Sequence, residues 1–550
     1  MIRNPILPGF NPDPSICRVG RDYYIATSTF EWYPGVQIHH SADLANWRLA
    51  ARPLDRASLL DMRGNPDSCG IWAPCLSYAD GLFWLVYTDV RRYDGNFKDA
   101  HNYITTAPAV TGPWSDPVYV NSSGFDPSLF HDDDGRKWFL NMYWNHVSNG
   151  VGGHPKHPSF AGILLQEYDA KAQKLVGEAK NVFRGSPHGL VEGPHLFKRD
   201  GWYYLTTAEG GTGYDHAVTM ARSRAIDGPY ELHPDTHIIT SKDAPDAPLQ
   251  RAGHGQIVET PEGEFYHTHL TSRPLPGTRR SPLGRETAIQ KCVWGADGWL
   301  RLAEGGKVPS VEVPAPGGAA HMPGPTRVDY AFDGPALPPD FQWLRTPYPE
   351  RIFSLTARRG HLRLFARESI GSWFEQALVA RRQEHFSFRA ETRIDFRPEN
   401  FQQAAGLVHY YNRHKFHFLA VTHDARHGRV LTILSCPGDW PDGRLAFPLA
   451  EPVVLQAEGP VELAMEVRDA ALQFHLRQNG DQHSGDQHRG VQFDGWRPVG
   501  PVLDASLISD EAGGGEHGSF TGAFVGIAAF DISGSVRPAD FGRFSYMAEG

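Results

Sequence analysis

The chain has 550 residues, which is too long for one ordinary domain, and its 40% of hydrophobic residues is enough to fill sizeable cores. A formal net charge of -10 argues against nucleic acid as the main partner, because phosphate binding needs a basic surface. No apolar stretch reaches the roughly 18 residues of a membrane span, and the N-terminus does not resemble a signal peptide. The five scattered cysteines suit a reducing compartment. We therefore expect a cytoplasmic protein.

A short pattern recurs five times in the first part of the chain: a turn residue or glycine, adjacent aromatics, and an apolar strand. The second aromatics of the five copies, roughly 60 residues apart, are Tyr24, Trp84, Phe139, Tyr204 and Tyr266. Each copy is typical of a hairpin turn that leads into the second strand of a four-stranded unit. With no helical periodicity between the units, the pattern predicts an all-β fold, a five-bladed β-propeller over residues 1–308. A β-sandwich with accidental spacing is the alternative.

A second set of segments precedes each aromatic pair and occupies one equivalent position in the five units. The residues at this position are Asp13, Ala73, Asp126, Glu192 and His254. In a propeller the first strand of each blade lines the central channel, so equivalent positions converge near the axis. The sequence therefore predicts three carboxylates and a histidine in one cavity.

Gathered carboxylates cannot all stay ionised in a partly dry site, so one pKa rises and its owner holds a proton near neutral pH. That supplies a general acid beside a general base, the combination that glycosidic cleavage needs. Two alternatives stay open: each Asp-Pro is also common turn chemistry, and the set of acids could hold a divalent cation. His254 could contact substrate, hold a water, bind a cation such as calcium, or fill the core. We expect no other cofactor.

The motifs around these residues resemble those of glycoside hydrolase family 43, in its β-xylosidase branch. They are Asn11-Pro12-Asp13-Pro14-Ser15, Gly70-Ile71-Trp72-Ala73-Pro74, Phe125-Asp126-Pro127-Ser128 and Glu192-Gly193-Pro194-His195. Together they are highly specific, and the resemblance covers essentially the whole chain. It implies a propeller that carries the catalytic residues and a second domain of concanavalin-like fold.

The resemblance also implies a role for each residue. Asp13 would be the general base that activates water, Glu192 the general acid, and Asp126 the residue that tunes and orients the acid. Arg285 matches an arginine that contacts the substrate among these carboxylates. The residues that match positions near the first sugar are Phe30, Trp72, Thr207 and His254. The family inverts the anomeric configuration, which predicts carboxyl groups of Asp13 and Glu192 roughly 6.5–9.5 Å apart, with room for a water.

A Pro/Gly-rich stretch over residues 309–326 is typical of a semi-rigid linker. Strand patterns resume over residues 327–550. The clearest are His385–Ile394, Lys415–Leu419, Val461–Val467 and Ala523–Ile527. They predict a β-sandwich of two sheets.

Such a sandwich could be a separate carbohydrate-binding module. The resemblance implies instead that it packs on the propeller and lends an aromatic, Phe520, to close one end of the active site and favour release of single sugars. The glycines 513–515 before it indicate a mobile loop. The alternative for Phe520 is a place in the core of the sandwich.

These observations predict an exo-acting, inverting β-1,4-xylosidase that releases xylose from the non-reducing end of short xylo-oligosaccharides, with α-L-arabinofuranosidase side activity. The main rival is an enzyme whose principal activity is the arabinofuranosidase. A related five-bladed fructosidase, a non-catalytic carbohydrate-binding propeller and a protein-interaction propeller are weaker alternatives. By the same resemblance we expect a homo-oligomer, a dimer or tetramer, that binds neither membrane nor nucleic acid.

Overall fold

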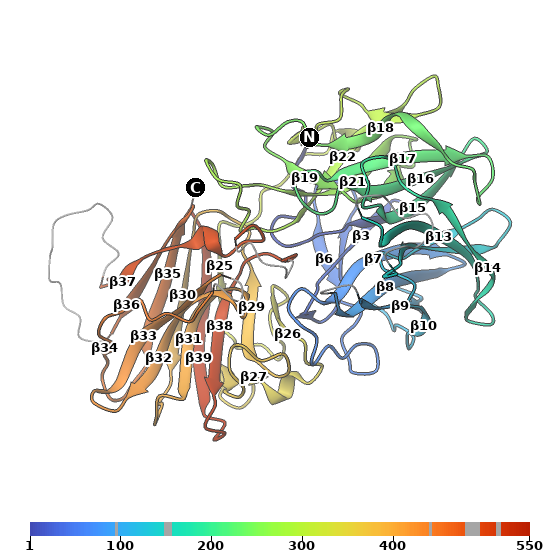
Figure 1. Ribbon diagram of the computed structural model, residues 1–550. Coiled ribbons are helices and arrows are strands. Elements are labelled where there is room, and N and C mark those ends of the chain that lie inside the picture. The colour runs from blue at the N-terminus through green and yellow to red at the C-terminus, as the bar shows by residue number, and fades with distance from the viewer. Residues whose placement is uncertain (94–96, 148–156, 439–442, 479–494, 513–518, 550) are drawn as a thin grey trace. The chain divides into compact units, whose positions relative to one another are not determined.

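The computed structural model describes residues 1–550 except 94–96, 148–156, 439–442, 479–494, 513–518 and 550 (Figure 1). The chain forms two compact units. The first comprises Met1–Asp61, Ser68–Arg273 and Arg285–Pro323, so it takes in most of the predicted linker, and the second comprises Met62–Asp67, Pro274–Gly284 and Gly324–Gly550. Within the described residues, no helix is long and apolar enough to cross a membrane.

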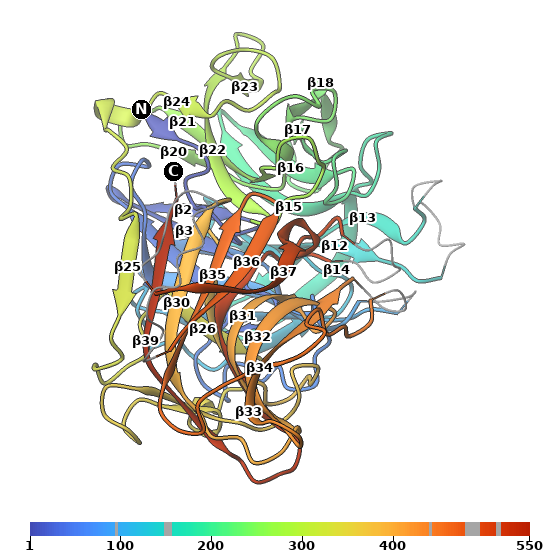
Figure 2. The same ribbon diagram turned by 90° about the vertical axis from the view of Figure 1, so that its left-hand side faces the viewer.

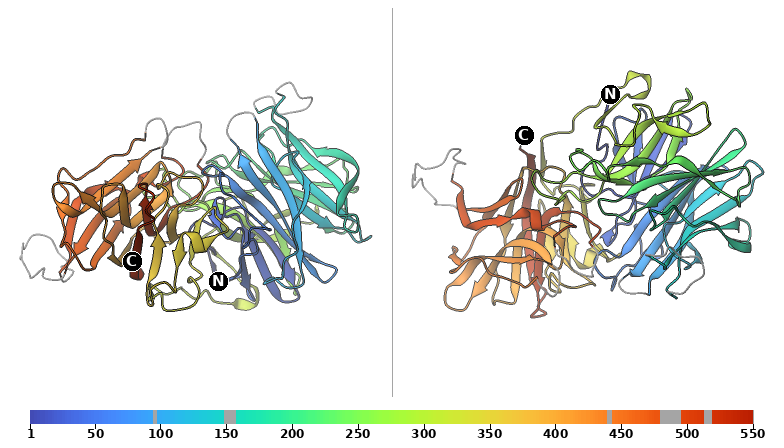
Figure 3. Two further views of the ribbon diagram at one scale, coloured as in Figure 1. Left: turned by 90° about the horizontal axis from the view of Figure 1, so that it is seen from below. Right: turned by 45° about the horizontal axis from the view of Figure 1, so that its top comes forward.

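The first unit is the predicted five-bladed β-propeller, with five antiparallel sheets in chain order (Figures 1 and 3). The first sheet contains β2 (Ser15–Val19), β3 (Asp22–Thr27), β5 (Gln37–Ser41) and β6 (Arg48–Ala51), and β4 (Trp32–Tyr33) precedes β5 along the chain. The second contains β7 (Gly70–Ala79), β8 (Leu82–Arg92), β9 (Asp99–Ala107) and β10 (Val118–Asn121). The third contains β11 (Ser128–His131), β12 (Lys137–Trp144), β13 (Phe160–Asp169) and β14 (Lys174–Phe183).

The last two sheets repeat the plan. The fourth contains β15 (Glu192–Arg199), β16 (Trp202–Glu209), β17 (Ala217–Ser223) and β18 (Glu231–Thr240). The fifth contains β19 (Gln250–Gly253), β20 (Ile257–Glu259), β21 (Phe265–Ser272), β22 (Glu286–Trp294) and β23 (Leu300–Leu302). The five repeated aromatics lie in β3, β8, β12, β16 and β21, and each of these strands pairs with the first strand of its sheet. In the fifth sheet the short β20 comes between β19 and β21 along the chain.

Apolar side chains pack between neighbouring sheets and hold the blades together. One buried cluster joins Val90, Leu140, Ile163 and Leu205, which come from the second, third and fourth sheets. The N-terminal strand β1 (Ile2–Arg3) pairs with β24 (Glu312–Val313), so the two ends of this unit meet. This arrangement brings the first strands of the five sheets to one centre, where the candidate site lies.

The second unit is the predicted sandwich of two sheets, seen in Figure 2. One sheet contains β25 (Arg327–Tyr330), β27 (Phe353–Ser354), β28 (Leu362–Phe365), β30 (Phe388–Asp395), β35 (Val461–Arg468), β36 (Ala471–Arg477), β37 (Arg497–Asp504) and β39 (Pro538–Ala548). The other contains β26 (Phe341–Leu344), β29 (Ala377–Arg382), β31 (Gln403–Asn412), β32 (Lys415–Asp424), β33 (Gly428–Pro437), β34 (Val453–Val454) and β38 (Phe524–Asp531). Short 3-10 helices are η1 (Pro316–Gly318), η2 (Pro349–Arg351) and η3 (Ala505–Leu507).

The period-two patterns of the sequence correspond to strands with one face in the core of this sandwich. In β30, Phe388, Ala390, Thr392 and Ile394 are fully buried, and the exposed Arg393 lies between two of them. The four predicted segments fall on β30, β32, β35 and β38, whose bounds differ from the predicted ones by a few residues. The sandwich prediction is therefore confirmed.

Candidate active site

The three predicted carboxylates are buried where the first strands of three blades begin. Asp13 stands two residues before β2, Asp126 two residues before β11, and Glu192 is the first residue of β15. Their exposed fractions are 5%, 7% and 8%. The negative charge of Asp13 acts on both of the other carboxyl groups and raises the pKa of each. The structure thus brings together three acids that are far apart in sequence.

The backbone at this position repeats around the propeller and corrects the sequence alignment by one residue. A positive φ, 55° at Asp13, 37° at Ala73, 54° at Asp126 and 43° at His254, recurs in the fourth blade at Gly193, with 57°. Glu192 therefore lies one residue earlier than the equivalent position. A Cβ at Gly193 would lie 2.9 Å from the ring of His254, so the close approach of that ring requires glycine here.

Asp13 has a cation and a hydroxyl in direct contact with its two oxygens. The Arg285 guanidinium donates a hydrogen bond of 2.9 Å to Oδ1, and the Ser28 hydroxyl donates one of 2.7 Å to Oδ2. Ser28 Oγ also accepts a bond of 2.8 Å from the backbone N–H of Ala73, which links the first two blades. These contacts give Asp13 a cation and a hydroxyl as direct partners and hold both of its oxygens in place. Ser28 was missed in the sequence, where it is one serine in a Thr/Ser run.

Glu192 and Asp126 have the opposite electrostatic environment. Burial, and then the charge of Asp13, raise the pKa of Glu192 to about 8, although Arg285 and Lys98 oppose this shift. Burial, and then the charges of Glu192 and Asp13, raise the pKa of Asp126 well above its usual range. One Asp126 oxygen accepts a hydrogen bond of 3.2 Å from the N–H of Gly193, beside Glu192. Glu192 therefore holds a proton at neutral pH.

Arg285 directly precedes β22, and this part of the chain is tied to the segment that carries Asp13. The Asn11 N–H donates to the Arg285 carbonyl at 3.0 Å, and the Thr287 hydroxyl donates to the Asn11 carbonyl at 2.5 Å. Between them, the buried Glu286 accepts from the Gly9 N–H at 2.8 Å and from two nitrogens of Arg273 at 2.7 and 2.8 Å. These contacts fix the base and its arginine relative to each other.

Two aromatic side chains from the first two blades, Phe30 and Trp72, lie beside Arg285. The Phe30 ring lies 5.7 Å from that of Trp72, and Arg285 lies 5.3 Å above the Phe30 ring. Trp72 Nε1 donates to the Ser68 carbonyl at 3.0 Å, which orients the indole. Thr207 is buried on β16, and within the described residues its hydroxyl has no hydrogen-bond partner. The predicted sugar-contacting residues thus offer apolar ring faces and one available hydroxyl.

His254 lies beside the base, with its Nδ1 3.8 Å from Asp13 Oδ1. Burial lowers the pKa of His254, so the imidazole is neutral at pH 7. Calcium takes six to eight oxygen ligands. The carboxylate of Asp13, which lies beside His254, is already bonded by Arg285 and Ser28. In the described part of the chain no group of three or more His, Cys, Asp or Glu side chains could hold a metal. The calcium site stays a prediction, and no step below depends on it.

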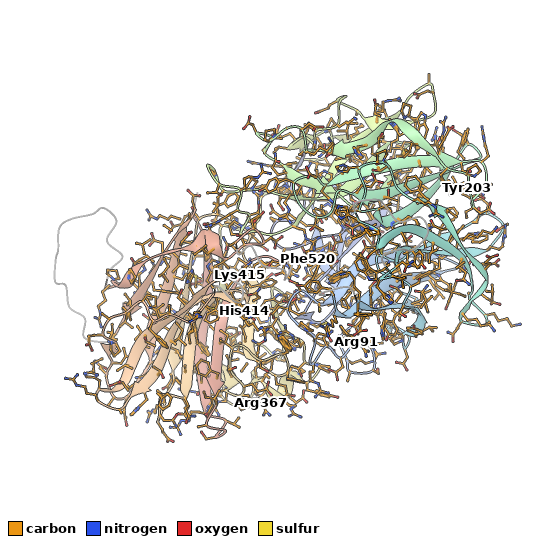
Figure 4. The ribbon with its side chains drawn as sticks, in the orientation of Figure 1. Arg91, Tyr203, Arg367, His414, Lys415 and Phe520 are labelled. Atoms are coloured by element: carbon orange, nitrogen blue, oxygen red, sulfur yellow. The ribbon has the colours of Figure 1, made fainter. Side chains whose placement is uncertain are left out.

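Phe520, labelled in Figure 4, belongs to the second unit, and its side chain is half-buried. Its neighbours are held within that unit: Lys415 Nζ donates to the Ser519 hydroxyl at 3.0 Å, and the Thr521 N–H donates to the Tyr411 hydroxyl at 2.9 Å. The glycines 513–515 lie outside the described residues. A contact of Phe520 with substrate stays a prediction.

Comparison with known proteins gives the family. Residues 2–300 match the glycosyl hydrolases family 43, and residues 329–547 match the β-xylosidase C-terminal concanavalin A-like domain. A xylosidase/arabinosidase 43B of Humicola insolens is 59% identical over 99% of this chain and 97% of its own length. A xylan 1,3-β-xylosidase of a Vibrio species is 43% identical over 99% of both chains.

Among solved structures, a xylan β-1,4-xylosidase from Bacillus halodurans C-125 superposes with a TM-score of 0.92, at 50% identity and over 100% of both chains. The likeness extends over both units. The chain therefore belongs to glycosyl hydrolase family 43 and is a glycoside hydrolase.

Proposed function

We propose that this enzyme removes xylose from the non-reducing end of short β-1,4-linked xylo-oligosaccharides with inversion, and that it also releases terminal α-L-arabinofuranose. The relatives named xylosidase and xylosidase/arabinosidase support this substrate class. The observation that carries the proposal is the contrast between two buried carboxyl groups of one site. Asp13 is ion-paired at 2.9 Å to Arg285, whereas burial and the Asp13 charge raise the pKa of Glu192 to about 8.

In the proposed reaction Asp13 takes a proton from a water molecule, whose oxygen attacks the anomeric carbon of the terminal xylose. The bond from that carbon to the glycosidic oxygen breaks, and Glu192 gives its proton to the leaving oxygen. The charge of the pair is conserved, because one carboxyl gains the proton that the other loses. Attack from the face opposite to the leaving group inverts the configuration.

The surrounding residues support these two steps. Arg285 is ion-paired to Asp13 and can donate to a sugar hydroxyl, while Phe30 and Trp72 offer apolar faces to the ring. Asp126 holds the Gly193 N–H at 3.2 Å and so fixes the backbone next to the acid. Burial, and then the charges of Glu192 and Asp13, raise the pKa of Asp126 itself.

The direct test compares turnover of xylobiose and of an aryl α-L-arabinofuranoside by the wild type, Asp13→Ala and Glu192→Ala. We expect the wild type to prefer xylobiose and Asp13→Ala to lose nearly all activity on both substrates. Faster arabinofuranoside turnover would favour the rival arabinofuranosidase. Release from neither substrate would favour a carbohydrate-binding propeller, and full activity in either variant would remove that residue from its role.

Linkage and assembly are separate parts of the proposal. Because one relative is named a xylan 1,3-β-xylosidase, 1,3-linked and 1,4-linked xylobiose should be compared in the same assay, and we expect the 1,4-linked sugar to be cleaved faster. We also expect a dimer or tetramer, which light scattering of the purified chain would detect and a monomeric mass would contradict.

A further inference from the structure

Another buried carboxyl group, that of Glu209, lies beside the strand that carries Glu192 and takes no part in the reaction as proposed. Glu209 is the last residue of β16 and its exposed fraction is 0%. Its oxygens accept hydrogen bonds from the Ser186 N–H at 2.6 Å, from the Ser186 hydroxyl, and from the Thr219 hydroxyl at 3.0 Å. A buried carboxylate is costly unless donors surround it, and here three do.

Ser186 belongs to the segment of residues 184–191, which joins β14 to Glu192. This segment lies directly on the Glu209 carboxylate, since a Cβ at Gly185 would be 2.8 Å from Oε1. Within the segment, the Gly189 N–H donates a hydrogen bond of 3.2 Å to the Ser186 carbonyl. The Gly210 N–H, next to Glu209, donates one of 2.9 Å to the Gly189 carbonyl. Glu209 and its neighbour Gly210 therefore hold both halves of the segment.

The same end of β16 also sets the position of the acid. Glu192 pairs with Ala208, the residue before Glu209, in the register of β15 and β16. The end of β16 thus makes two contacts. Ala208 pairs with Glu192, and the Glu209 carboxylate holds the segment that precedes Glu192. Displacing this segment would move the start of β15, where a misplacement of about 1 Å is enough to impair proton transfer.

We infer that Glu209 is a positioning residue, which holds residues 184–191 so that Glu192 is aimed at the leaving oxygen. The inference rests on the proposed role of Glu192 as general acid.

It predicts that loss of Glu209 slows the hydrolysis of some substrates much more than that of others. Protonation of the leaving oxygen matters for xylobiose, whose leaving group is an alcohol, and much less for 2,4-dinitrophenyl β-xyloside, whose leaving group is already a weak base.

The test measures kcat on both substrates for the wild type, Glu209→Leu, Glu209→Gln and Ser186→Ala. For Glu209→Leu we expect kcat on xylobiose to fall about 10- to 100-fold, with kcat on the dinitrophenyl xyloside changed less than about threefold. Glu209→Gln should lose less of the kcat on xylobiose, because its amide oxygen can still accept the hydrogen bond from the Ser186 N–H. Glu264→Gln, at the turn before β21, is the matched control and should leave both rates unchanged.

Equal losses on the two substrates, or full xylobiose turnover by Glu209→Leu, would overturn the inference. If Glu209→Leu does not fold, Ser186→Ala must show the same selectivity on a smaller scale, and its absence counts equally against the inference. Glu192→Ala in the same assay separates this outcome from failure of the proposed function. It must itself lose xylobiose turnover selectively, and a uniform loss there would remove Glu192 as the acid.

Discussion

At the scale of single residues, the proposed reaction rests on two buried carboxyl groups, Asp13 and Glu192, that have different partners. Asp13 has Arg285 and Ser28 within hydrogen-bond distance. Glu192 begins β15, and within the described residues no ion pair of its carboxyl group with a cation is seen; burial is the first cause of its raised pKa. The proposed roles of acid and base rest on these surroundings rather than on the residue types.

The raised pKa of Glu192 predicts the alkaline limb of the pH profile. Since the acid must be protonated, kcat/KM on xylobiose should fall as the pH rises through about 8. The Lys98 charge lowers the pKa of Glu192, so Lys98→Met should move this limb to higher pH. A limb that stays in place in Lys98→Met, or one near pH 4.5, would contradict the assignment.

The same carboxyl group should make the folded chain less stable at alkaline pH. In the folded state Glu192 keeps its proton up to about pH 8, whereas the ordinary value is 4.5. The folded state therefore binds more protons between these values, and the free energy of unfolding falls as the pH rises. Glu192→Gln removes this titration, so at pH 8 we expect it to be more stable than the wild type by on the order of 4 kcal/mol, against about 1 kcal/mol at pH 5. Denaturant unfolding at both pH values measures this, and parallel pH dependence of the two proteins would contradict it.

Sequence reasoning identified the three acids because a repeat gives equivalent positions without any alignment of relatives. It misplaced Glu192 by one residue, since the positive φ that marks the position falls on Gly193. It also missed Ser28, Lys98 and Glu209. Their contacts with the site join residues far apart in the chain or in different blades, and nothing in their local sequence distinguishes them.

At the scale of elements, the first strands carry the acids, and the connections between blades fix them. Glu286 on β22 bonds both the Gly9 N–H and the Arg273 guanidinium. It holds the segment before Asp13 in the way that we infer Glu209 holds the segment before Glu192. Glu286 would position the base Asp13 and Glu209 the acid Glu192. Substitutions of the two residues should therefore have different effects on kcat for the two substrates.

Glu286→Gln should lower kcat about tenfold on xylobiose and on the dinitrophenyl xyloside alike, because every substrate needs the water that Asp13 activates. Steady-state kinetics on both substrates checks this, with circular dichroism to show that the variant is folded. A loss confined to xylobiose would place Glu286 with the acid and contradict the assignment to the base.

The elements themselves were predictable from the hairpin turns and from period-two burial, which are local properties of the chain. Tyr24 and Tyr204 fall in second strands, and β30 alternates as expected. The assignment of residues 62–67 and 274–284 to the second unit was not predictable. It depends on tertiary contacts, and these short segments carry no pattern of their own.

At the scale of the whole molecule, the account depends on the propeller gathering residues 13, 126, 192 and 285 around one centre. A closed ring of five sheets is needed for this, because the base and the acid come from the first and fourth blades. The pairing of β1 with β24 joins the ends of that ring.

The most direct test of the central claim is the configuration of the first sugar released. Proton NMR during xylobiose hydrolysis, recorded before mutarotation, distinguishes the two anomers of free xylose. If Asp13 activates water on one face of the ring while Glu192 protonates the leaving oxygen on the other, the newly released xylose at first contains more of the α anomer than the mutarotation equilibrium. An initial excess of the β anomer over that equilibrium would show retention and contradict the assignment of Asp13 as the general base.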